Sequence, residues 1–140
     1  MPACCLTPDP DAGSPLVAPA TYWTASRARK AAICNGCGAK HGISRYFIPN
    51  SLWGLSVRPA CDIHDWMYFQ GISPADREYA DLTFLRNLLS LVEQGHGPLA
   101  KALRLPRRLR ALSYYGAVRD FGAAAFRTDK GADAAHMLEK

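Results

Sequence analysis

The sequence predicts an all-α fold in one small domain, and three observations lead to this prediction. The chain has 140 residues, the length of one ordinary domain. Residues 57–71 and 73–95 show helical patterns bounded by residues that start and stop helices. No segment alternates between apolar and polar residues as a half-buried strand does. Since 49% of the residues are hydrophobic, the chain can form a core of its own.

The first 20 residues are expected to be a flexible lead-in. They contain five prolines together with Gly13 and Ser14, a composition that disfavours regular structure. They also lack a basic start followed by a continuous apolar run, so no signal peptide is expected. The folded domain is then predicted over residues 21–127. An opening helix is expected at residues 22–33 and an ordered glycine-containing loop at residues 34–56.

Two long helices are predicted to form an antiparallel pair. The first is expected to be capped by Ser56 and to end at Gly71. The second has Ser73 as its cap and Asp76 as its acidic third residue, and it ends at Gly95. After a Gly/Pro loop, residues 99–105 predict a short helical turn, and Pro106 is expected to open a last helix that runs to Phe121 or Phe126. The tail at residues 128–140 is expected to fray.

The first long helix has an unusual polar stripe. Cys61, His64, Asp65 and Tyr68 occupy positions i, i+3, i+4 and i+7, which share one side of a helix. Such a stripe beside a core is costly unless its polar groups are satisfied or used in function. The stripe therefore marks a candidate site.

The tight turn between the two helices predicts a partner for His64. His64 lies eight to nine positions before the centre of the turn and Asp81 eight to nine positions after it, so they should lie at the same level of the pair. A carboxylate that holds one imidazole nitrogen frees the other nitrogen to accept a proton. His64 and Asp81 are therefore candidates for a general base and the residue that orients it.

Asp65 is a candidate metal ligand beside this pair. Ca²⁺ prefers several oxygen ligands, often backbone carbonyls of a glycine-containing loop together with one or two carboxylates. The loop at residues 34–38 would offer such carbonyls and the side chain of Asn35. A cation held there would polarise an ester carbonyl.

Several segments resemble the secreted phospholipase A2 superfamily, in particular its small prokaryotic and fungal branch. Residues 60–68 (ACDIHDWMY) look like the family's C-x-x-H-D helix, and residues 50–61 (NSLWGLSVRPAC) resemble the run that leads into it. The segment ADLTFLRNL from Ala80 is similar to the second helix, and residues 113–122 (SYYGAVRDFG) to the closing helix. The resemblance covers residues 34–122. It implies a fold built on two antiparallel catalytic helices, a calcium-binding loop and a C-terminal helix.

The resemblance implies a role for each matching residue. His64 would activate water and Asp81 would orient His64, while Asp65 would bind Ca²⁺. Tyr68 would help to close the site, and Tyr114 or Tyr115 would hydrogen-bond near Asp81.

The loop before the first catalytic helix departs from the family pattern. A disulfide between Cys37 and Cys61 would tie the calcium loop to the catalytic helix. Where the prokaryotic branch has Asp-x-Cys, this chain has Asn35, Gly36 and Cys37, with Asn35 and the Gly36 carbonyl as the implied metal ligands. A neutral amide oxygen in place of a carboxylate predicts weaker calcium binding.

The positive charge is concentrated near the C-terminus. Residues 1–95 carry equal numbers of basic and acidic residues, so residues 96–140 supply the whole net charge of +5. A basic stretch interleaved with leucines predicts docking on an anionic membrane surface, or else a solvated helix face. Nucleic acid is not the expected partner, because no recognised binding motif accompanies the stretch. The candidate lipid-contacting residues are Lys101, Arg104, Arg107 and Arg108.

Two other functions stay open at this point. Cys34, Cys37, Cys61 and His64 have the spacing of a structural zinc site, in which His64 could not act as a base. A catalytically silent phospholipase-like fold is the second alternative, and the Asn35 departure favours it slightly. The five cysteines leave the redox compartment ambiguous, because an odd number cannot pair completely within the chain.

The function expected from these observations is calcium-dependent hydrolysis of the sn-2 ester of a glycerophospholipid, with water as the nucleophile. The protein is expected to be a monomer that binds the membrane peripherally, since no run of about 18 apolar residues predicts a spanning helix. The resemblance implies secreted or extracellular action, which the lack of a recognisable signal peptide leaves open.

Overall fold

The computed structural model describes residues 5–11, 13–34 and 49–126. Three long helices dominate this part of the chain, as the sequence predicts for an all-α fold. α3 spans Arg58–Gln70, α4 spans Pro74–Gln94 and α5 spans Pro98–Phe121. The smaller elements are β1 (Leu6–Pro8), β2 (Val17–Pro19), α1 (Ala20–Thr24), α2 (Arg27–Ile33), β3 (Ser51–Leu52) and β4 (Leu55–Ser56).

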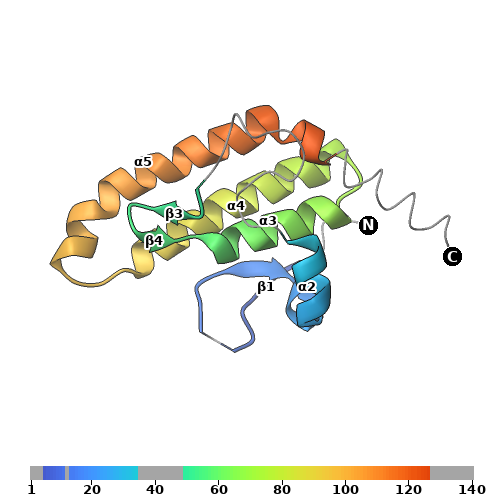
Figure 1. Cartoon of the computed structure of the whole chain (residues 1–140), viewed down its shortest axis with the longest axis horizontal. Helices are drawn as coiled ribbons and strands as arrows, with labels where there is room; N and C mark the ends of the chain where they lie inside the picture. Colours follow the sequence, from blue (N-terminus) through green and yellow to red (C-terminus); the bar gives the residue numbers. More distant parts are fainter. Residues whose placement is uncertain (1–4, 12, 35–48, 127–140) are drawn as a thin grey trace, which may run out of the picture.

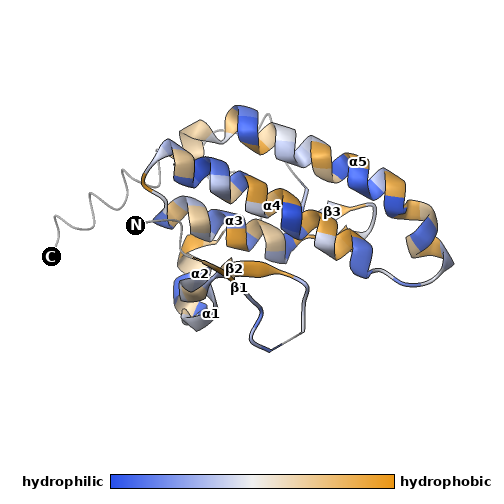
Figure 2. Cartoon of the chain, turned by 180° about the vertical axis from the view of Figure 1, so that it is seen from behind, coloured by the Kyte–Doolittle hydropathy of each residue, from blue (hydrophilic) through white to orange (hydrophobic). Residues whose placement is uncertain are grey.

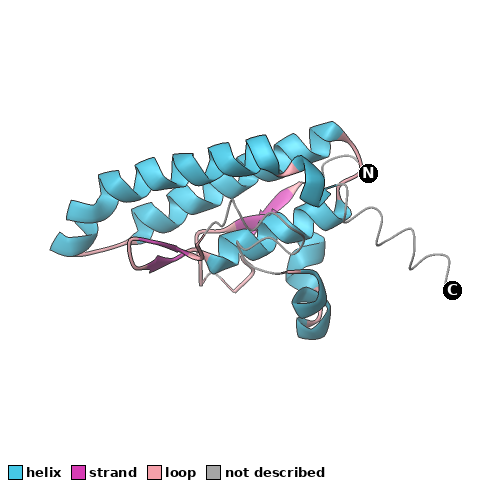
Figure 3. Ribbon diagram, turned by 45° about the horizontal axis from the view of Figure 1, so that its top comes forward, coloured by secondary structure: helices cyan, strands magenta, loops and turns pink. Residues whose placement is uncertain are grey.

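The long helices lie side by side in chain order. α4 packs against α3 on one side and α5 on the other, and the N-terminal elements gather beside α3 (Figures 1 and 3). Within the described part of the chain, no helix is both long enough and apolar enough to cross a membrane. The antiparallel α3–α4 pair thus lies between α5 and the N-terminal elements.

The expectation of a flexible lead-in over residues 1–20 is wrong for its described part. β1 and β2 pair antiparallel, with Thr7 opposite Ala18, and Leu16 and Ala18 are buried in the core. The amide side chain of Asn87 on α4 accepts a hydrogen bond from the Val17 N–H (3.0 Å) and donates one to the Val17 carbonyl (2.9 Å). These contacts with a distant helix stabilise a proline-rich segment whose local composition disfavours structure.

The connection between α3 and α4 follows the sequence prediction closely. Ser73 and Asp76 form a capping box, in which the Ser73 side chain accepts from the Asp76 N–H. The backbone N–H groups of Ser73 and Ile72 donate to Asp76 and hold the pKa of its carboxyl below the usual value. The N-cap of α3 is Val57 rather than Ser56, and it has no side-chain capping bond. α4 ends at Gln94 with Gly95 as its C-cap, as predicted.

Two predicted boundaries are wrong. The opening helix divides into α1 and α2, because Ala25 is extended and Ser26 caps a new helix at Arg27. Conversely, α5 is one helix from Pro98 to Phe121 and contains Pro106, which was expected to start a separate helix. Proline removes one helical hydrogen bond, but contacts on both sides of Pro106 hold the helix together.

Those contacts come from three arginines of α5. Arg104 and Arg108 both pair with Glu93 on α4, the latter at 2.6 Å. Arg107 donates to the carbonyls of Leu52 (3.1 Å) and Trp53 (2.9 Å) in the β3–β4 hairpin. Tertiary interactions thus override the local preference of a proline to end the helix.

The β3–β4 hairpin lies at the start of α3, inside the stretch predicted to be a loop. Trp53 and Gly54 form its turn with φ values of 47° and 79°, the positive values that a two-residue type I′ turn requires. Leu52 of this hairpin is fully buried.

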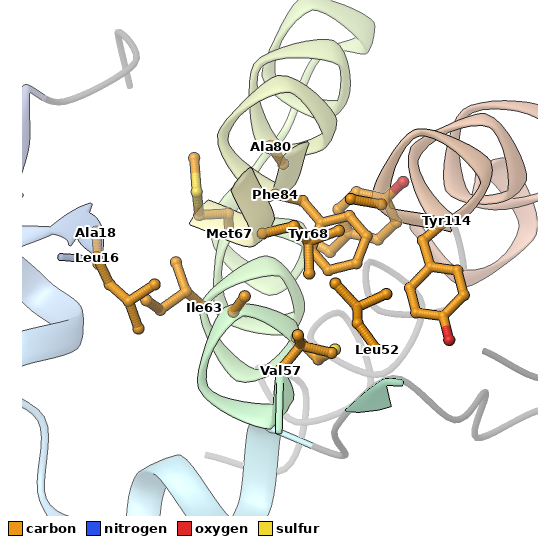
Figure 4. Close-up of a cluster of buried hydrophobic side chains, with 14 of the residues drawn as sticks. Leu16, Ala18, Leu52, Val57, Ile63, Met67, Tyr68, Ala80, Phe84 and Tyr114 are labelled. Carbon is orange, nitrogen blue, oxygen red and sulfur yellow. The ribbon is translucent and has the colours of Figure 1, made fainter. Parts of the chain in front are cut away.

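Apolar side chains surround α3 on more than one side. Ile63 points toward Leu16 and Ala18 of the N-terminal hairpin, whereas Tyr68 points toward Phe84 of α4 (Figure 4). Three residues of the polar stripe of α3, Cys61, His64 and Tyr68, are therefore buried, and their polar groups need partners.

Candidate functional site

His64 and Asp81 meet across the α3–α4 pair, as their mirrored positions predict. The His64 Nε2 atom lies 2.8 Å from Asp81 Oδ1. Both residues are buried, with exposed fractions of 7% for His64 and 3% for Asp81. The polar stripe on α3 and the Asp81 side chain on α4 are thus brought together by helix packing.

This contact determines the role of each imidazole nitrogen. A carboxylate oxygen can only accept, so Nε2 carries the hydrogen and donates it to Asp81. Nδ1 is then the nitrogen that can accept a proton from another molecule. His64 therefore has the arrangement of an oriented general base.

Tyr68 completes a three-residue hydrogen-bonded group. Its hydroxyl donates to the same Asp81 Oδ1 atom at 2.6 Å, so this oxygen accepts from both His64 and Tyr68. Burial, followed by the hydrogen bond to Asp81, raises the pKa of the Tyr68 phenol well above its usual value. The phenol stays protonated and remains a donor throughout the neutral pH range.

Aromatic rings fix the plane of the imidazole. The ring centroid of His64 lies 4.1 Å from that of Tyr68 and 4.8 Å from that of Phe84. Phe126 packs edge-on against Tyr68 at 5.4 Å. The imidazole is held by packing as well as by its hydrogen bond, which restricts its rotation.

Two residues that support Tyr68 were not identified from the sequence. A side chain at Gly122 would overlap with the Tyr68 hydroxyl and with the Val118 carbonyl oxygen, so the end of α5 approaches Tyr68 too closely for any other residue. Arg77, one turn before Asp81, donates to the carbonyls of Val118 and Arg119 at this same end of α5. Its guanidinium also lies near the Tyr68 hydroxyl, where its charge partly offsets the rise in pKa.

The sequence gives one indication that Arg77 supports Tyr68. Arg77 lies four residues before Asp81, so the two share one side of the helix. The Gly122 contact has none, because the sequence does not reveal how closely α5 approaches α3.

The two candidate tyrosines of α5 have different positions. The Tyr114 hydroxyl donates to the Ser51 carbonyl at 2.8 Å, so Tyr114 holds the β3–β4 hairpin and not Asp81. Tyr115 lines a polar hollow of about 240 Å³ together with Arg77, Asp81 and Arg119. Of the two, Tyr115 lies on the side of α5 that faces Asp81.

The proposed metal ligands are only partly described. Asp65 is half-buried on α3 next to His64, whereas Asn35 and Gly36 lie outside the described residues. Within residues 5–11, 13–34 and 49–126, no group of three or more His, Cys, Asp or Glu side chains is placed to hold a metal ion. Among the described residues Asp65 thus offers carboxylate oxygens of the kind that Ca²⁺ prefers, and the expected ligands Asn35 and Gly36 would add amide and carbonyl oxygens.

The state of the cysteines bears on the zinc alternative. Cys61 lies in a disulfide bond, as predicted for that residue, and Cys37 lies outside the described residues. Cys34 is buried and its thiol donates to the Asp62 carbonyl at 3.2 Å. A sulfur in a disulfide is not the thiolate that zinc needs, so the disulfide at Cys61 disfavours zinc.

The basic residues predicted to contact lipid are largely engaged within the protein. Arg104 and Arg108 pair with Glu93, and Arg107 binds the hairpin carbonyls. Lys101 is exposed. Most of this group therefore has a structural role in joining α5 to α4 and to the β3–β4 hairpin.

No family model matches the chain, and no curated protein and no solved structure matches it. Functional inference therefore depends on the geometry of His64, Tyr68 and Asp81.

Proposed function

We propose that this protein is a calcium-dependent phospholipase A2-like hydrolase that cleaves the sn-2 ester of glycerophospholipids. The observation that supports this most is the buried contact of His64 Nε2 with Asp81 Oδ1, reinforced by the Tyr68 hydroxyl. It joins residues 17 positions apart on two different helices into the arrangement of a general base.

In this proposal His64 accepts a proton from water through Nδ1 while that water attacks the ester carbonyl. Asp81 stabilises the imidazolium that forms, and Tyr68 stabilises the Asp81 carboxylate. His64 then returns the proton to the departing alcohol, which leaves a lysophospholipid and a fatty acid. No acyl-enzyme forms, because water is the nucleophile.

Asp65 is the described residue that would hold calcium. Calcium, when bound, would supply a positive charge for the carbonyl oxygen as it becomes an oxyanion. Asn35 and the Gly36 carbonyl would complete the ligand set, and the neutral amide of Asn35 would make binding weaker than a second carboxylate would.

The test is fatty-acid release from phosphatidylglycerol vesicles by wild type and His64→Ala, each in calcium and in EGTA. We expect release that needs both His64 and calcium. His96→Ala is the matched control, since His96 is exposed in the connection between α4 and α5 and should be dispensable. Absence of release by the wild type at every calcium concentration would contradict the proposal and favour a silent phospholipase-like fold.

The zinc alternative is examined with the same preparations. About one zinc per chain, lost from His64→Ala, would indicate a metal module instead of a hydrolase. The disulfide at Cys61 leads us to expect no stoichiometric zinc.

A further inference from the structure

The outer surface of α5 is unusually apolar beside the β3–β4 hairpin. Leu109 lies two positions before the buried Ala111, so it is on the opposite side of the helix. Leu105 and Leu109 are 62% and 59% exposed, and Trp53 at the hairpin turn is 58% exposed. Figure 2 shows hydrophobic and hydrophilic segments alternating along α5. These side chains border a shallow hollow of about 420 Å³, lined by Trp53, Leu105, Pro106, Leu109, Arg110 and Ser113.

These six residues form a surface that we call the docking face. Exposed aromatic and leucine side chains that gather in this way usually mark an interaction site. Trp53 is also held in place, because Arg107 donates to its carbonyl and its backbone has a positive φ in a tight turn. The backbone that carries this exposed tryptophan is thus fixed at the surface.

The charge around the docking face has a single sign. No acidic residue occurs between Glu93 and Asp120, whereas this stretch contains one lysine and five arginines: Lys101, Arg104, Arg107, Arg108, Arg110 and Arg119. Glu93 pairs with Arg104 and Arg108, but Arg110 lines the face itself. The surface is therefore apolar at its centre and positive at its edge.

We propose that the docking face binds the surface of an anionic phospholipid bilayer. Trp53 and the leucines would enter the boundary between head groups and acyl chains, and Arg110 would contact anionic head groups. The choice of phospholipid as the partner rests on the proposed function. A second copy of the chain is a poorer fit, because two such faces would bring like charges together without a carboxylate between them.

This assignment differs from the sequence expectation. The lipid contacts were expected from Lys101, Arg104, Arg107 and Arg108, but the three arginines among them hold α5 to its neighbours. The docking face instead depends on Trp53, which is distant in sequence, and on the leucines that alternate with those arginines.

The experiment is co-sedimentation of the full chain with vesicles in EGTA, so that binding is measured without hydrolysis. The vesicles are an equimolar mixture of phosphatidylglycerol and phosphatidylcholine, or phosphatidylcholine alone. We expect the double variant Leu105→Ser/Leu109→Ser to bind the mixed vesicles roughly a hundredfold more weakly, about tenfold for each leucine. Arg110→Gln should bind them about fivefold more weakly and should not alter binding to phosphatidylcholine.

The matched control is Leu82→Ser. Leu82 is 48% exposed on α4, in a separate apolar hollow with Leu85 and Leu89, and its replacement should leave vesicle binding unchanged. Loss of binding in Leu82→Ser but not in the double variant would overturn the proposal. The proposal would also be overturned if the wild type formed a dimer that the Leu105→Ser/Leu109→Ser substitutions dissociate. Binding of the wild type to RNA that the same substitutions abolish would overturn it as well.

A second measurement requires no change to the leucines. Trp66 is buried and Trp23 is partly buried, so a blue shift of tryptophan emission on mixed vesicles would come from Trp53. Brominated acyl chains should quench this emission in the wild type and have little effect on Trp53→Phe. Equal quenching in both proteins would contradict the proposal. The binding assays are done in EGTA, so they do not depend on hydrolysis. A protein that binds vesicles in EGTA but releases no fatty acid in calcium would refute the proposed hydrolase and leave the proposed docking face intact.

Discussion

The Asp81 carboxylate is nearly inaccessible to water, and one of its oxygens receives hydrogens from both His64 and Tyr68. Burying a charged group is costly unless donors replace the lost water, so this pair of donors stabilises the carboxylate where it lies. The same contacts determine which imidazole nitrogen is left to act as a base. Stability and the proposed chemistry thus depend on the same three side chains.

The raised pKa of Tyr68 leads to a prediction about alkaline stability. The folded protein retains the phenolic proton at a pH where the unfolded chain releases it, so the free energy of unfolding should fall from about pH 10 upward. Tyr68→Phe should show a shallower fall, measured by urea unfolding at several pH values. Burial also raises the pKa of Tyr22, so the fall should be reduced and not abolished. Equal slopes for the two proteins would contradict this assignment.

At the scale of elements, the C-terminal end of α5 acts as a support for α3. Gly122 touches the Tyr68 hydroxyl, and Arg77 of α4 donates to the last carbonyls of α5. The site therefore needs three helices, although its polar residues come from only two.

Gly122→Ala should disturb the site through a single methyl group. We expect a loss of about 1–3 kcal/mol in the free energy of unfolding, because the added carbon would overlap with Tyr68 and Val118. Fatty-acid release should fall as well, since Tyr68 would shift away from Asp81. Gly122 has a helical φ of −73°, so the effect would come from packing and not from backbone strain.

Gly116→Ala is the matched control on the same helix. An added carbon at Gly116 would meet no atom within 4 Å, so alanine should stabilise α5 by up to about 1 kcal/mol. If Gly122→Ala and Gly116→Ala both destabilise the protein, the effect at Gly122 would not be caused by its contact with Tyr68.

At the scale of the whole molecule, Asn87 joins the N-terminal hairpin to the helices. It is fully buried and makes hydrogen bonds with both the N–H and the carbonyl of Val17. The hairpin in turn covers the side of α3 that carries Ile63 (Figure 4). One amide side chain thus satisfies two buried backbone groups of a segment 70 residues away.

Asn87→Ala should destabilise the protein by about 2–4 kcal/mol, because two buried backbone groups would lose their partner. Urea unfolding measures this change, and limited proteolysis should cut residues 5–20 more readily in the variant. Ser90→Ala, on the same helix, removes an exposed hydroxyl and should change the stability by less than about 0.5 kcal/mol. A similar effect of the two substitutions would argue against this role for Asn87.

Local patterns were sufficient to predict much of this structure. The Ser73–Asp76 cap, the end of α4 at Gly95 and the His64–Asp81 contact were all predicted, because each depends on neighbouring residues or on a tight turn between two regular helices. Helical geometry has a fixed rise and period, so positions equidistant from a short turn meet predictably.

Only the tertiary structure decided the rest. The order of the N-terminal hairpin depends on Asn87. The continuity of α5 through Pro106 depends on Glu93 and on the carbonyls of the β3–β4 hairpin. The approach of Gly122 to Tyr68 depends on how α5 lies over the α3–α4 pair. In each case a contact between distant residues outweighs a local preference of proline or glycine. Such contacts are set by the packing of whole elements, which no window of neighbouring residues specifies.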